Sequence, residues 1–380
     1  MFFSEVVGQE ALKEQLLQTV RENRISHARL FLGPEGAGSL PLAIVYAQYV
    51  NCTARGERES CGKCPSCVKF KKLAHPDLHF VFPVIKQGSG KVSVSDVFIK
   101  EWRETVLANP YISYNQWLER LGGDNKQGGI FVDESREILN KLSFKTYEAE
   151  YKIMIIWLAE KMNPQTANKL LKILEEPPEK TLFLLVAESA DRILPTILSR
   201  TQITRVPKIN TQSLANYLVE TEHAPSTHIA LNTARISNGN LAAALNILQS
   251  SEENEDYLKM FIQLMRTCWS VWAKKQAMLE LMDWCEKITQ LGREQQKAFL
   301  LYCLRMVREN FALNRQQPSL AFLTDAENEF SQKFNTFIHP GNVYQLADEL
   351  NTAHYHIEAN GNKNLVFMDL ACKIVVLMKH

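Results

Sequence analysis

Four cysteines within one short segment are the residues whose spacing predicts chemistry most directly. Cys61-Gly-Lys-Cys64-Pro-Ser-Cys67 forms two overlapping C-x-x-C turns, and Cys52 lies nine residues upstream. This spacing lets four thiolates converge on one tetrahedral zinc ion, with Zn–S distances of about 2.3 Å. No coordination position would remain open, so the zinc would be structural and would contribute folding energy. Basic residues that would partly offset the thiolate charge surround the loop: Arg55, Arg58, Lys63 and Lys69. The other interpretation is a disulfide or free thiols.

A glycine loop is the second candidate site. The apolar run Ala28-Arg-Leu-Phe-Leu predicts a buried strand, and Gly33-Pro-Glu-Gly36-Ala-Gly38 follows it. A phosphate-binding loop of the form G-x-x-x-x-G-K-[ST] uses its Lys on the phosphates and its Ser or Thr on magnesium. Here Ser39 stands at the Lys position and Leu40 at the Ser/Thr position. The loop is therefore expected to be empty or to hold an anion weakly through its N–H groups; a bare turn without ligand fits the sequence equally well.

Strands and helices alternate around these two loops. Further strands are expected near residues 75–82, 151–158 and 181–186, and helices over 40–50, 130–143 and 164–176. Asn163 and Pro164 are typical of a helix start, and Pro177-Pro178 of a helix end. This order is typical of a parallel α/β domain, which we expect over residues 1–208.

Two departures from this pattern help to define the domains. Residues 52–67 hold the cysteines, and residues of about 85–129 read as an insertion whose aromatic residues are expected to pack locally: Trp102, Tyr111, Tyr114 and Trp117. Beyond Pro207 no strand is expected, so 209–252 is predicted as a small helical unit and 253–380 as a larger one. In the larger one the stripe from Met260 to Met282, with Trp269 and Trp272, is interpreted as bundle core. The same interpretation applies to the remaining cysteines: Cys268, Cys285, Cys303 and Cys372.

Composition narrows the function classes. The chain has 380 residues, is 46% hydrophobic and carries a net charge of +1, which is typical of a globular protein and gives no global basic field for nucleic acid. No run of about 18 apolar residues predicts a membrane span, and the first residues do not resemble a signal peptide. The cysteine distribution favours a reducing, cytoplasmic setting.

Longer motifs resemble the bacterial clamp-loader AAA+ family. The opening segments are Val7-Gly-Gln-Glu10, Ile25-Ser-His-Ala28 and the glycine loop; the more specific ones are Asn163-Pro-Gln-Thr-Ala-Asn-Lys-Leu-Leu-Lys-Ile-Leu-Glu-Glu-Pro-Pro178 and Leu194-Pro-Thr-Ile-Leu-Ser-Arg-Thr201. Thr201 departs from the family, which usually has Cys there. The resemblance covers residues 1 to about 250 and implies an AAA+ domain with a P-loop-type parallel sheet, a helical lid and an all-α collar that assembles a ring.

The same resemblance assigns positions to the catalytic groups of an active family member. Trp157 and Leu158 stand where an Asp and a Glu would hold magnesium and position water, and Ala242 stands where the lid would carry a phosphate-sensing Arg. Arg200, with Ser199, matches the arginine that reaches the ATP of a neighbouring subunit, where such a finger acts in trans. The plainer interpretation is that Arg200 pairs with a nearby carboxylate such as Asp191.

These losses favour a delta-prime-type subunit of the DNA polymerase III clamp loader that does not hydrolyse ATP itself. The resemblance implies gamma/tau-type ATPases and delta as partners, and contact with the sliding clamp and primer-template DNA through the complex. Three other readings remain: an active ATPase motor subunit of the same complex, a zinc-bearing nucleic-acid adaptor, and a non-replicative scaffold that shares the fold.

Overall fold

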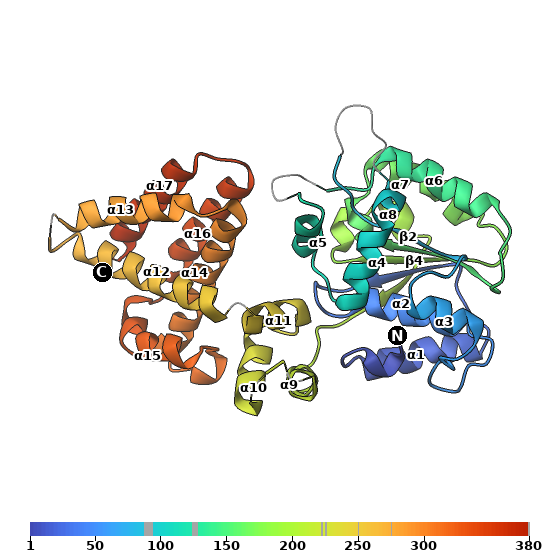
Figure 1. Cartoon of the computed structure of the whole chain (residues 1–380). Coiled ribbons are helices and arrows are strands. Elements are labelled where there is room, and N and C mark those ends of the chain that lie inside the picture. The colour runs from blue at the N-terminus through green and yellow to red at the C-terminus, as the bar shows by residue number, and fades with distance from the viewer. Residues whose placement is uncertain are drawn as a thin grey trace. The chain divides into compact units, whose positions relative to one another are not determined.

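The computed structural model describes residues 1–86, 94–123, 128–221, 223–224, 226–249, 251–274 and 276–378. These residues form two compact units, 1–245 and 246–380 (Figure 1). The predicted insertion at about 85–129 therefore falls partly outside the described residues. Within the described residues, no helix combines the length and the apolar character that a membrane crossing requires.

A five-stranded sheet with every pairing parallel forms the centre of the first unit. Its strand order is β2-β3-β4-β1-β5. The strands are β1 (Ala28–Leu32), β2 (Leu78–Val81), β3 (Lys152–Trp157), β4 (Thr181–Ala187) and β5 (Gln202–Arg205). The predicted strands and the α/β class are confirmed, and β5 is a strand that the sequence reading did not identify.

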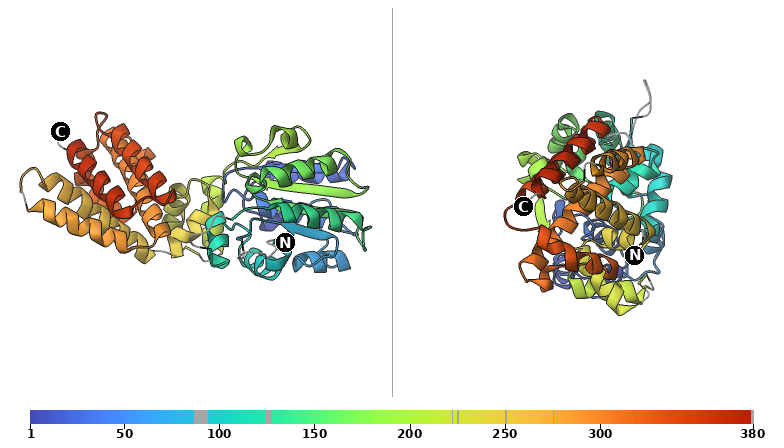
Figure 2. Two further views of the ribbon diagram at one scale, coloured as in Figure 1. Left: turned by 90° about the horizontal axis from the view of Figure 1, so that it is seen from above. Right: turned by 90° about the vertical axis from the view of Figure 1, so that its left-hand side faces the viewer.

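Helices cover both faces of this sheet (Figures 1 and 2). The helices of the α/β domain are α1 (Glu10–Arg21), α2 (Ser39–Val50), α3 (Pro65–Lys71), α4 (Ile99–Ala108), α5 (Tyr114–Arg120), α6 (Val132–Ser143), α7 (Pro164–Glu175) and α8 (Pro195–Leu198), with short 3-10 turns η1 (Phe3–Glu5), η2 (Ser95–Phe98), η3 (Ala159–Lys161) and η4 (Ala190–Arg192). Strand β3 shows the division: Ile153 and Ile155 belong to the core shared with α1, α2, α4 and α5, whereas Met154 and Ile156 belong to the core shared with α6 and α7. Alternate side chains of a strand point to opposite faces, so every residue of this strand is buried.

Helix α7 begins as its sequence predicts. The Asn163 side chain accepts a hydrogen bond from the Thr166 backbone N–H at 2.7 Å, and Pro164 is the first helical residue. An Asn cap satisfies one of the N–H groups that a helix start leaves unpaired. The long signature segment is therefore a capped helix on one face of the sheet.

The insertion contributes two helices, α4 and α5, to the opposite face. Ser95 ties the insertion to α6, because Glu134 accepts hydrogen bonds from the Ser95 backbone N–H at 2.7 Å and from its hydroxyl at 3.1 Å. Trp102 and Trp117 are fully buried in the large core beside β2 and β3. The insertion's tryptophans thus pack into the core of the domain as well as against each other.

A small helical unit follows β5 and still belongs to the first compact unit for most of its length. It consists of α9 (Thr211–Glu220), α10 (Thr227–Ile236) and α11 (Leu241–Gln249). Asn240 precedes α11, and its side-chain oxygen accepts a hydrogen bond from the Ala243 backbone N–H at 3.0 Å. The predicted limits of this unit, 209 and 252, stay predictions.

The second unit is helical. It contains α12 (Ser251–Ser270), α13 (Ala277–Gln290), α14 (Arg293–Asn314), α15 (Asp325–Phe334), α16 (Val343–Glu358) and α17 (Lys363–Leu377), with 3-10 turns η5 (Pro318–Leu320) and η6 (Asn335–Phe337). One hydrophobic core joins these helices. Two predictions are wrong here: Cys372 is exposed, and Trp269 and Trp272 are each about half exposed. A helical stripe wider than the contact face leaves its outer members in solvent.

Candidate functional site

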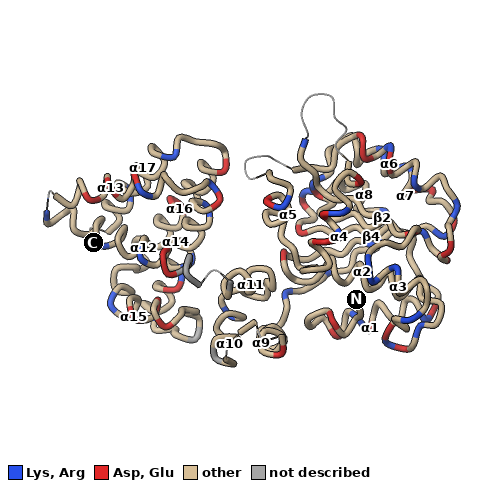
Figure 3. Tube along the Cα trace, viewed as in Figure 1, with Lys and Arg blue, Asp and Glu red and all other residues tan. Residues whose placement is uncertain are grey.

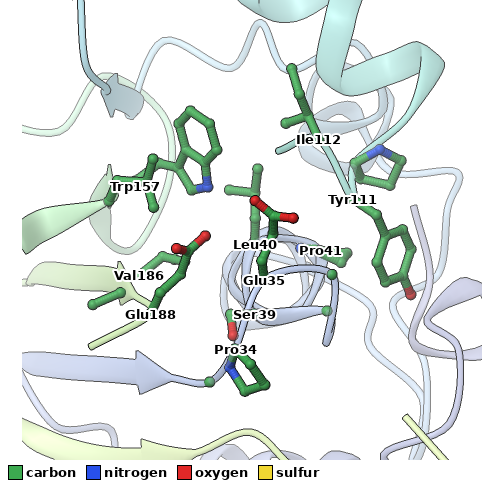
Figure 4. A pocket seen from close by; sticks show the side chains of 16 residues that line it. Pro34, Glu35, Ser39, Leu40, Pro41, Tyr111, Ile112, Trp157, Val186 and Glu188 are labelled. Atoms are coloured by element: carbon green, nitrogen blue, oxygen red, sulfur yellow. The ribbon is translucent and has the colours of Figure 1, made fainter. Parts of the chain in front are cut away.

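The glycine loop lies where the carboxyl ends of β1, β3 and β4 meet. Open α/β sheets bind ligands at this edge. Figure 4 shows the cavity there, lined by residues at or just after the ends of β1, β3 and β4 and by the insertion segment Pro110 to Ile112. Its free volume is only about 30 Å³, whereas small-molecule sites typically have roughly 300–1,000 Å³.

The charges in this cavity have the wrong sign for a phosphate. The two charged side chains that line it are Glu35 and Glu188, and both carboxylates project into it (Figure 4). Partial burial and the neighbouring carboxylates of Glu35 and Glu160 raise the pKa of Glu188 to about 7. Ser39 and Leu40 are buried at the start of α2. Among the described lining residues, no cation is available for a phosphate.

The end of β3 carries an aromatic residue where an active family member would hold magnesium. Trp157 is 4% exposed, and its ring centroid lies 5.1 Å from that of Trp102. Leu158 is buried in a left-handed backbone conformation with φ of 54°. Glu160 lies farther along, where its carboxylate accepts the Glu188 backbone N–H at 2.8 Å. Trp157 therefore packs against the insertion, and Glu160 binds the backbone after β4. Both Trp157 and Leu158 line the cavity, as the sequence positions predicted.

The chain's own polar groups hold the glycine loop. The Gly36 carbonyl accepts a hydrogen bond from the Leu241 N–H at 3.2 Å, and Asn240 Nδ2 donates to Glu35 Oε1 at 3.1 Å. A Cβ atom on Gly36 would lie 1.9 Å from Asn240 Oδ1, and the Gly36 φ of 70° favours glycine. The predicted Gly33, Gly36 and Gly38 are therefore required by backbone geometry and close packing.

Arg200 follows the end of helix α8 by two residues. Its guanidinium forms an ion pair with Glu175 at the end of α7 and donates to the Thr196 carbonyl at 2.9 Å. Its side chain is 33% exposed and that of Glu175 is 48% exposed. The carboxylate partner that the sequence reading suggested, Asp191, is not the one observed in these contacts. Ion pairs this exposed are weak and exchange readily with solvent or another anion.

The four cysteines converge as predicted. The sulfur atoms of Cys52, Cys61, Cys64 and Cys67 all lie within 4.8 Å of one another, and all four thiols are free. Cys61 and Cys67 have their sulfurs 3.9 Å apart. A tetrahedral site with Zn–S bonds of about 2.3 Å requires sulfur separations of about 3.8 Å, so the donor set fits zinc.

Backbone hydrogen bonds lower the pKa of Cys61 and Cys64 and favour their thiolates, whereas burial raises the pKa of Cys52 and Cys67. Cys61 N–H donates to Cys52 Sγ at 3.2 Å, and Cys64 N–H donates to Cys61 Sγ at 3.3 Å. Burial opposes ionisation of Cys64, but hydrogen bonds from Cys67 and Thr53 lower its pKa to about 6. Hydrogen bonds to the charged form stabilise it. Lys69, one of the predicted offsetting cations, is paired with Glu148 at 2.6 Å.

Two residues of the glycine-loop site escaped sequence reasoning. The Tyr111 hydroxyl accepts a hydrogen bond from the Val7 N–H at 2.8 Å, although the two residues are 104 positions apart in the sequence. No local sequence pattern predicts this contact. Asn240 precedes an apolar helical stretch, so its helix-capping role was accessible from sequence, although its contact with Glu35 was not.

Charges of both signs are interspersed along the chain (Figure 3), in agreement with the net charge of +1. A protein that binds nucleic acid through bulk electrostatics usually shows a basic face or stripe. The balanced total gives no such support to the nucleic-acid adaptor.

Comparison with known proteins finds relatives among DNA polymerase III subunits. The chain is 25% identical over 388 residues to the Bacillus subtilis DNA polymerase III subunit tau, with 98% of this chain and 61% of that protein covered. It is 27% identical over 252 residues to the B. subtilis subunit delta' (66% of this chain, 63% of that protein) and 27% identical over 294 residues to the Haemophilus influenzae subunit delta' (77% and 74%). The chain thus spans less than two thirds of the length of either B. subtilis relative.

A solved structure of a DNA polymerase III, gamma subunit-related protein from Thermotoga maritima aligns with 96% of this chain and 100% of its own, at a TM-score of 0.41 and 16% identity. The family described as DNA polymerase III, delta subunit, matches residues 8–210, which is more than half of the 380 residues and includes the glycine loop, the cysteine loop and Arg200. The chain belongs to this DNA polymerase III delta-subunit family.

Proposed function

We propose that the chain is a delta-prime-type subunit of a DNA polymerase III clamp loader. In this role it does not hydrolyse ATP, supplies Arg200 in trans to a neighbouring ATPase subunit, and helps to load the sliding clamp onto primer-template DNA. Its partners would be gamma/tau-type ATPases and a delta subunit in a cytoplasmic, hetero-oligomeric ring. The family membership and the two delta' relatives support this assignment.

The observation that carries the proposal is the chemistry of the glycine-loop cavity. Phosphoryl transfer depends on positioning and on cations that neutralise developing charge. Ser39 and Leu40 replace the groups that would contact phosphate and magnesium, Trp157 fills the metal-holding position, and the charged lining residues are acidic. Such a cavity disfavours Mg-ATP on steric and electrostatic grounds alike.

Arg200 is the group that we assign to catalysis in trans. Its guanidinium pairs with Glu175 at the surface, and the weakness of an exposed pair allows the γ-phosphate of a neighbour's ATP to replace the carboxylate. No residue of the chain's own glycine loop takes part in that step.

Two measurements test the proposal. The purified chain should show no Mg-dependent ATPase activity, and the complex reconstituted with Arg200→Ala should lose turnover at the adjoining site by about 10³-fold or more. Arg200→Lys should restore little, because lysine lacks the planar fork. Arg192→Ala, an exposed arginine in η4, is the matched control and should leave turnover unchanged. Normal turnover with Arg200→Ala in a fully assembled complex would refute the role of Arg200.

We further propose that the cysteine loop holds one structural zinc ion. The four sulfurs leave no position for water or substrate, so the metal would stabilise the loop and would not act on a substrate. Metal analysis of protein purified without added zinc should give about one equivalent per chain.

The second candidate is an active ATPase motor subunit of the same complex. One observation favours it: the match to subunit tau extends over 98% of this chain, farther than the match to either delta' protein. Calorimetry separates the two candidates, because a motor subunit would bind Mg-ATP as an isolated chain. Failure to co-purify with other clamp-loader subunits would count against both.

A further inference from the structure

Two parts of the chain outside the strands and α2 pack against the glycine loop. One part is the insertion, through Tyr111, and the other is the start of α11, through Asn240. We propose that these two contacts form an interlock that fixes the glycine loop and α11 in one arrangement, so that no nucleotide is needed to join them. The inference rests on the proposed absence of nucleotide from this site, and the Tyr111 and Asn240 variants below test the two contacts separately from ATP binding.

Tyr111 fixes one side of the loop. It is 5% exposed, and its hydroxyl accepts the Val7 N–H at 2.8 Å. A Cβ atom on Gly38 would lie 3.3 Å from the Tyr111 ring, so the ring packs directly on the last glycine of the loop. Pro110 and Ile112 line the same cavity. Tyr111 therefore ties three separate segments together: the N-terminal segment, the glycine loop and the insertion.

A rigid aromatic cluster supports this segment of the insertion. Trp102 stacks on Phe82 with ring centroids 4.3 Å apart, and it also contacts Trp157, which lines the cavity. Trp117 donates a hydrogen bond from its indole N–H to the Pro83 carbonyl at 2.7 Å. Well-packed, hydrogen-bonded aromatic residues keep a single arrangement. Trp157 is thus part of the support of the insertion as well as a replacement for a metal ligand.

Asn240 fixes the other side. Its side chain donates to Glu35 Oε1 at 3.1 Å while its oxygen caps α11, and the next residue, Leu241, donates its N–H to the Gly36 carbonyl. Gln9 adds a bond to the Ala37 carbonyl at 3.1 Å and another to the Pro207 carbonyl. The loop carbonyls are therefore bound by α11 and by the segment before α1.

The charges of the cavity are consistent with self-closure. An acidic residue in a phosphate-binding loop opposes phosphate binding, but Glu35 can serve as the acceptor for Asn240. Glu188 adds a second carboxylate to the same space. Glu35, which opposes a nucleotide, therefore also stabilises the contact that replaces it.

Hydrogen exchange on the full-length chain tests the interlock. Segments 5–9, 33–42 and 238–245 of the wild-type chain should be equally protected with and without millimolar Mg-ATP. Tyr111→Phe removes the hydroxyl bond and should speed exchange at Val7 and in the glycine loop by roughly fivefold to tenfold. Asn240→Ala should have a similar effect on the glycine loop and on the first turn of α11.

Matched controls separate the interlock from a general loss of stability. Tyr114→Phe removes another hydroxyl of the insertion, which bonds to the Gly128 carbonyl at 2.8 Å. Asn210→Ala removes the cap of α9 without a contact to the loop. The inference is overturned if Tyr111→Phe and Asn240→Ala change loop exchange no more than these controls, if they speed exchange evenly over the whole α/β domain, or if Mg-ATP raises the protection of the wild-type loop.

Discussion

The glycine loop and the cysteine loop lie at opposite ends of one helix. Gly38 immediately precedes α2, and Cys52 follows its last residue by two positions. At the cysteine loop the four donor atoms converge within 4.8 Å. At the glycine loop the glycine spacing matches that of a phosphate-binding loop, and the residues that line the cavity include Ser39, Leu40 and Trp157.

The comparison teaches that the backbone of a site and its donor groups are separate features. Glycine spacing alone matches an active phosphate loop, because turn geometry and close packing require those glycines in either case. The donor groups decide what a site can do: four thiolates fit a cation, whereas two carboxylates in the cavity oppose a phosphate.

The largest effect is expected at the cysteine loop. Cys64→Ser should abolish zinc binding and lower the free energy of unfolding of the α/β domain by several kcal/mol, because structural zinc contributes about 10–16 kcal/mol in small zinc-dependent domains. Metal analysis and thermal unfolding measure both effects. The control is Cys372→Ser, which changes an exposed cysteine. Unaltered metal content in Cys64→Ser would contradict the equivalence of the four ligands.

A carboxylate introduced at position 157 should not enable the glycine-loop cavity to bind Mg-ATP. Trp157→Asp should destabilise the chain by about 4 kcal/mol, because it leaves a cavity beside Trp102 and buries a charge. Denaturant unfolding measures the loss, and Trp157→Phe, which keeps an aromatic ring, should lose less. Tight Mg-ATP binding by Trp157→Asp in calorimetry would show that the cavity is a site lacking only its metal ligand.

The buried carboxyl group of Glu134, which accepts two hydrogen bonds from Ser95 of the insertion, should make the stability of the chain depend on pH. Burial raises the pKa of Glu134 from 4.5 to about 7. The folded chain therefore holds the Glu134 proton more tightly than the unfolded chain. The stabilisation that this gives to the free energy of unfolding is fully present below about pH 4.5 and is lost as the pH rises through about 7. Glu134→Gln keeps an acceptor for Ser95 but does not titrate.

With Glu134→Gln, the fall in unfolding free energy between pH 5 and pH 8 should be smaller, by at most about 3 kcal/mol. Unfolding measured at a series of pH values provides the comparison. Glu137→Gln, one turn of α6 away by sequence, is the control and should follow the wild type. An unchanged pH profile in Glu134→Gln would mean that the carboxylate is hydrated in solution.

The smallest effect is expected at the partner of Arg200. Glu175→Gln should change the free energy of unfolding by less than about 1 kcal/mol, because both side chains of the pair are partly exposed. In a reconstituted complex it should leave ATPase turnover close to normal, in contrast to Arg200→Ala. A loss of turnover as large as that of Arg200→Ala would mean that Glu175 positions the guanidinium.

Local signals predicted much of the fold. Asn163 and Pro164 mark the start of α7 because capping depends on a few consecutive residues. The buried strands β1, β3 and β4 follow from short apolar runs, and the cysteine cluster follows from spacing within one loop. Each of these features is decided within about 15 residues of sequence, the reach of pattern reasoning.

The features that sequence did not predict depend on contacts over long separations. The bond between Val7 and Tyr111 joins positions 104 apart, and that between Glu35 and Asn240 joins positions 205 apart. The partner of Arg200 was misplaced for the same reason, because the end of α7 approaches α8 only in the folded chain. Cys372 was misassigned because an apolar neighbourhood in sequence does not say which side of a helix meets the core.

Helix α2 gives the two loops a mechanical relation. All twelve of its residues are buried, so it can neither turn about its axis nor slide without displacing its neighbours. It is about 18 Å long at 1.5 Å per residue. It therefore acts as a strut: a displacement of the cysteine loop would be transmitted through the helix to the glycine loop, with little of it absorbed by bending.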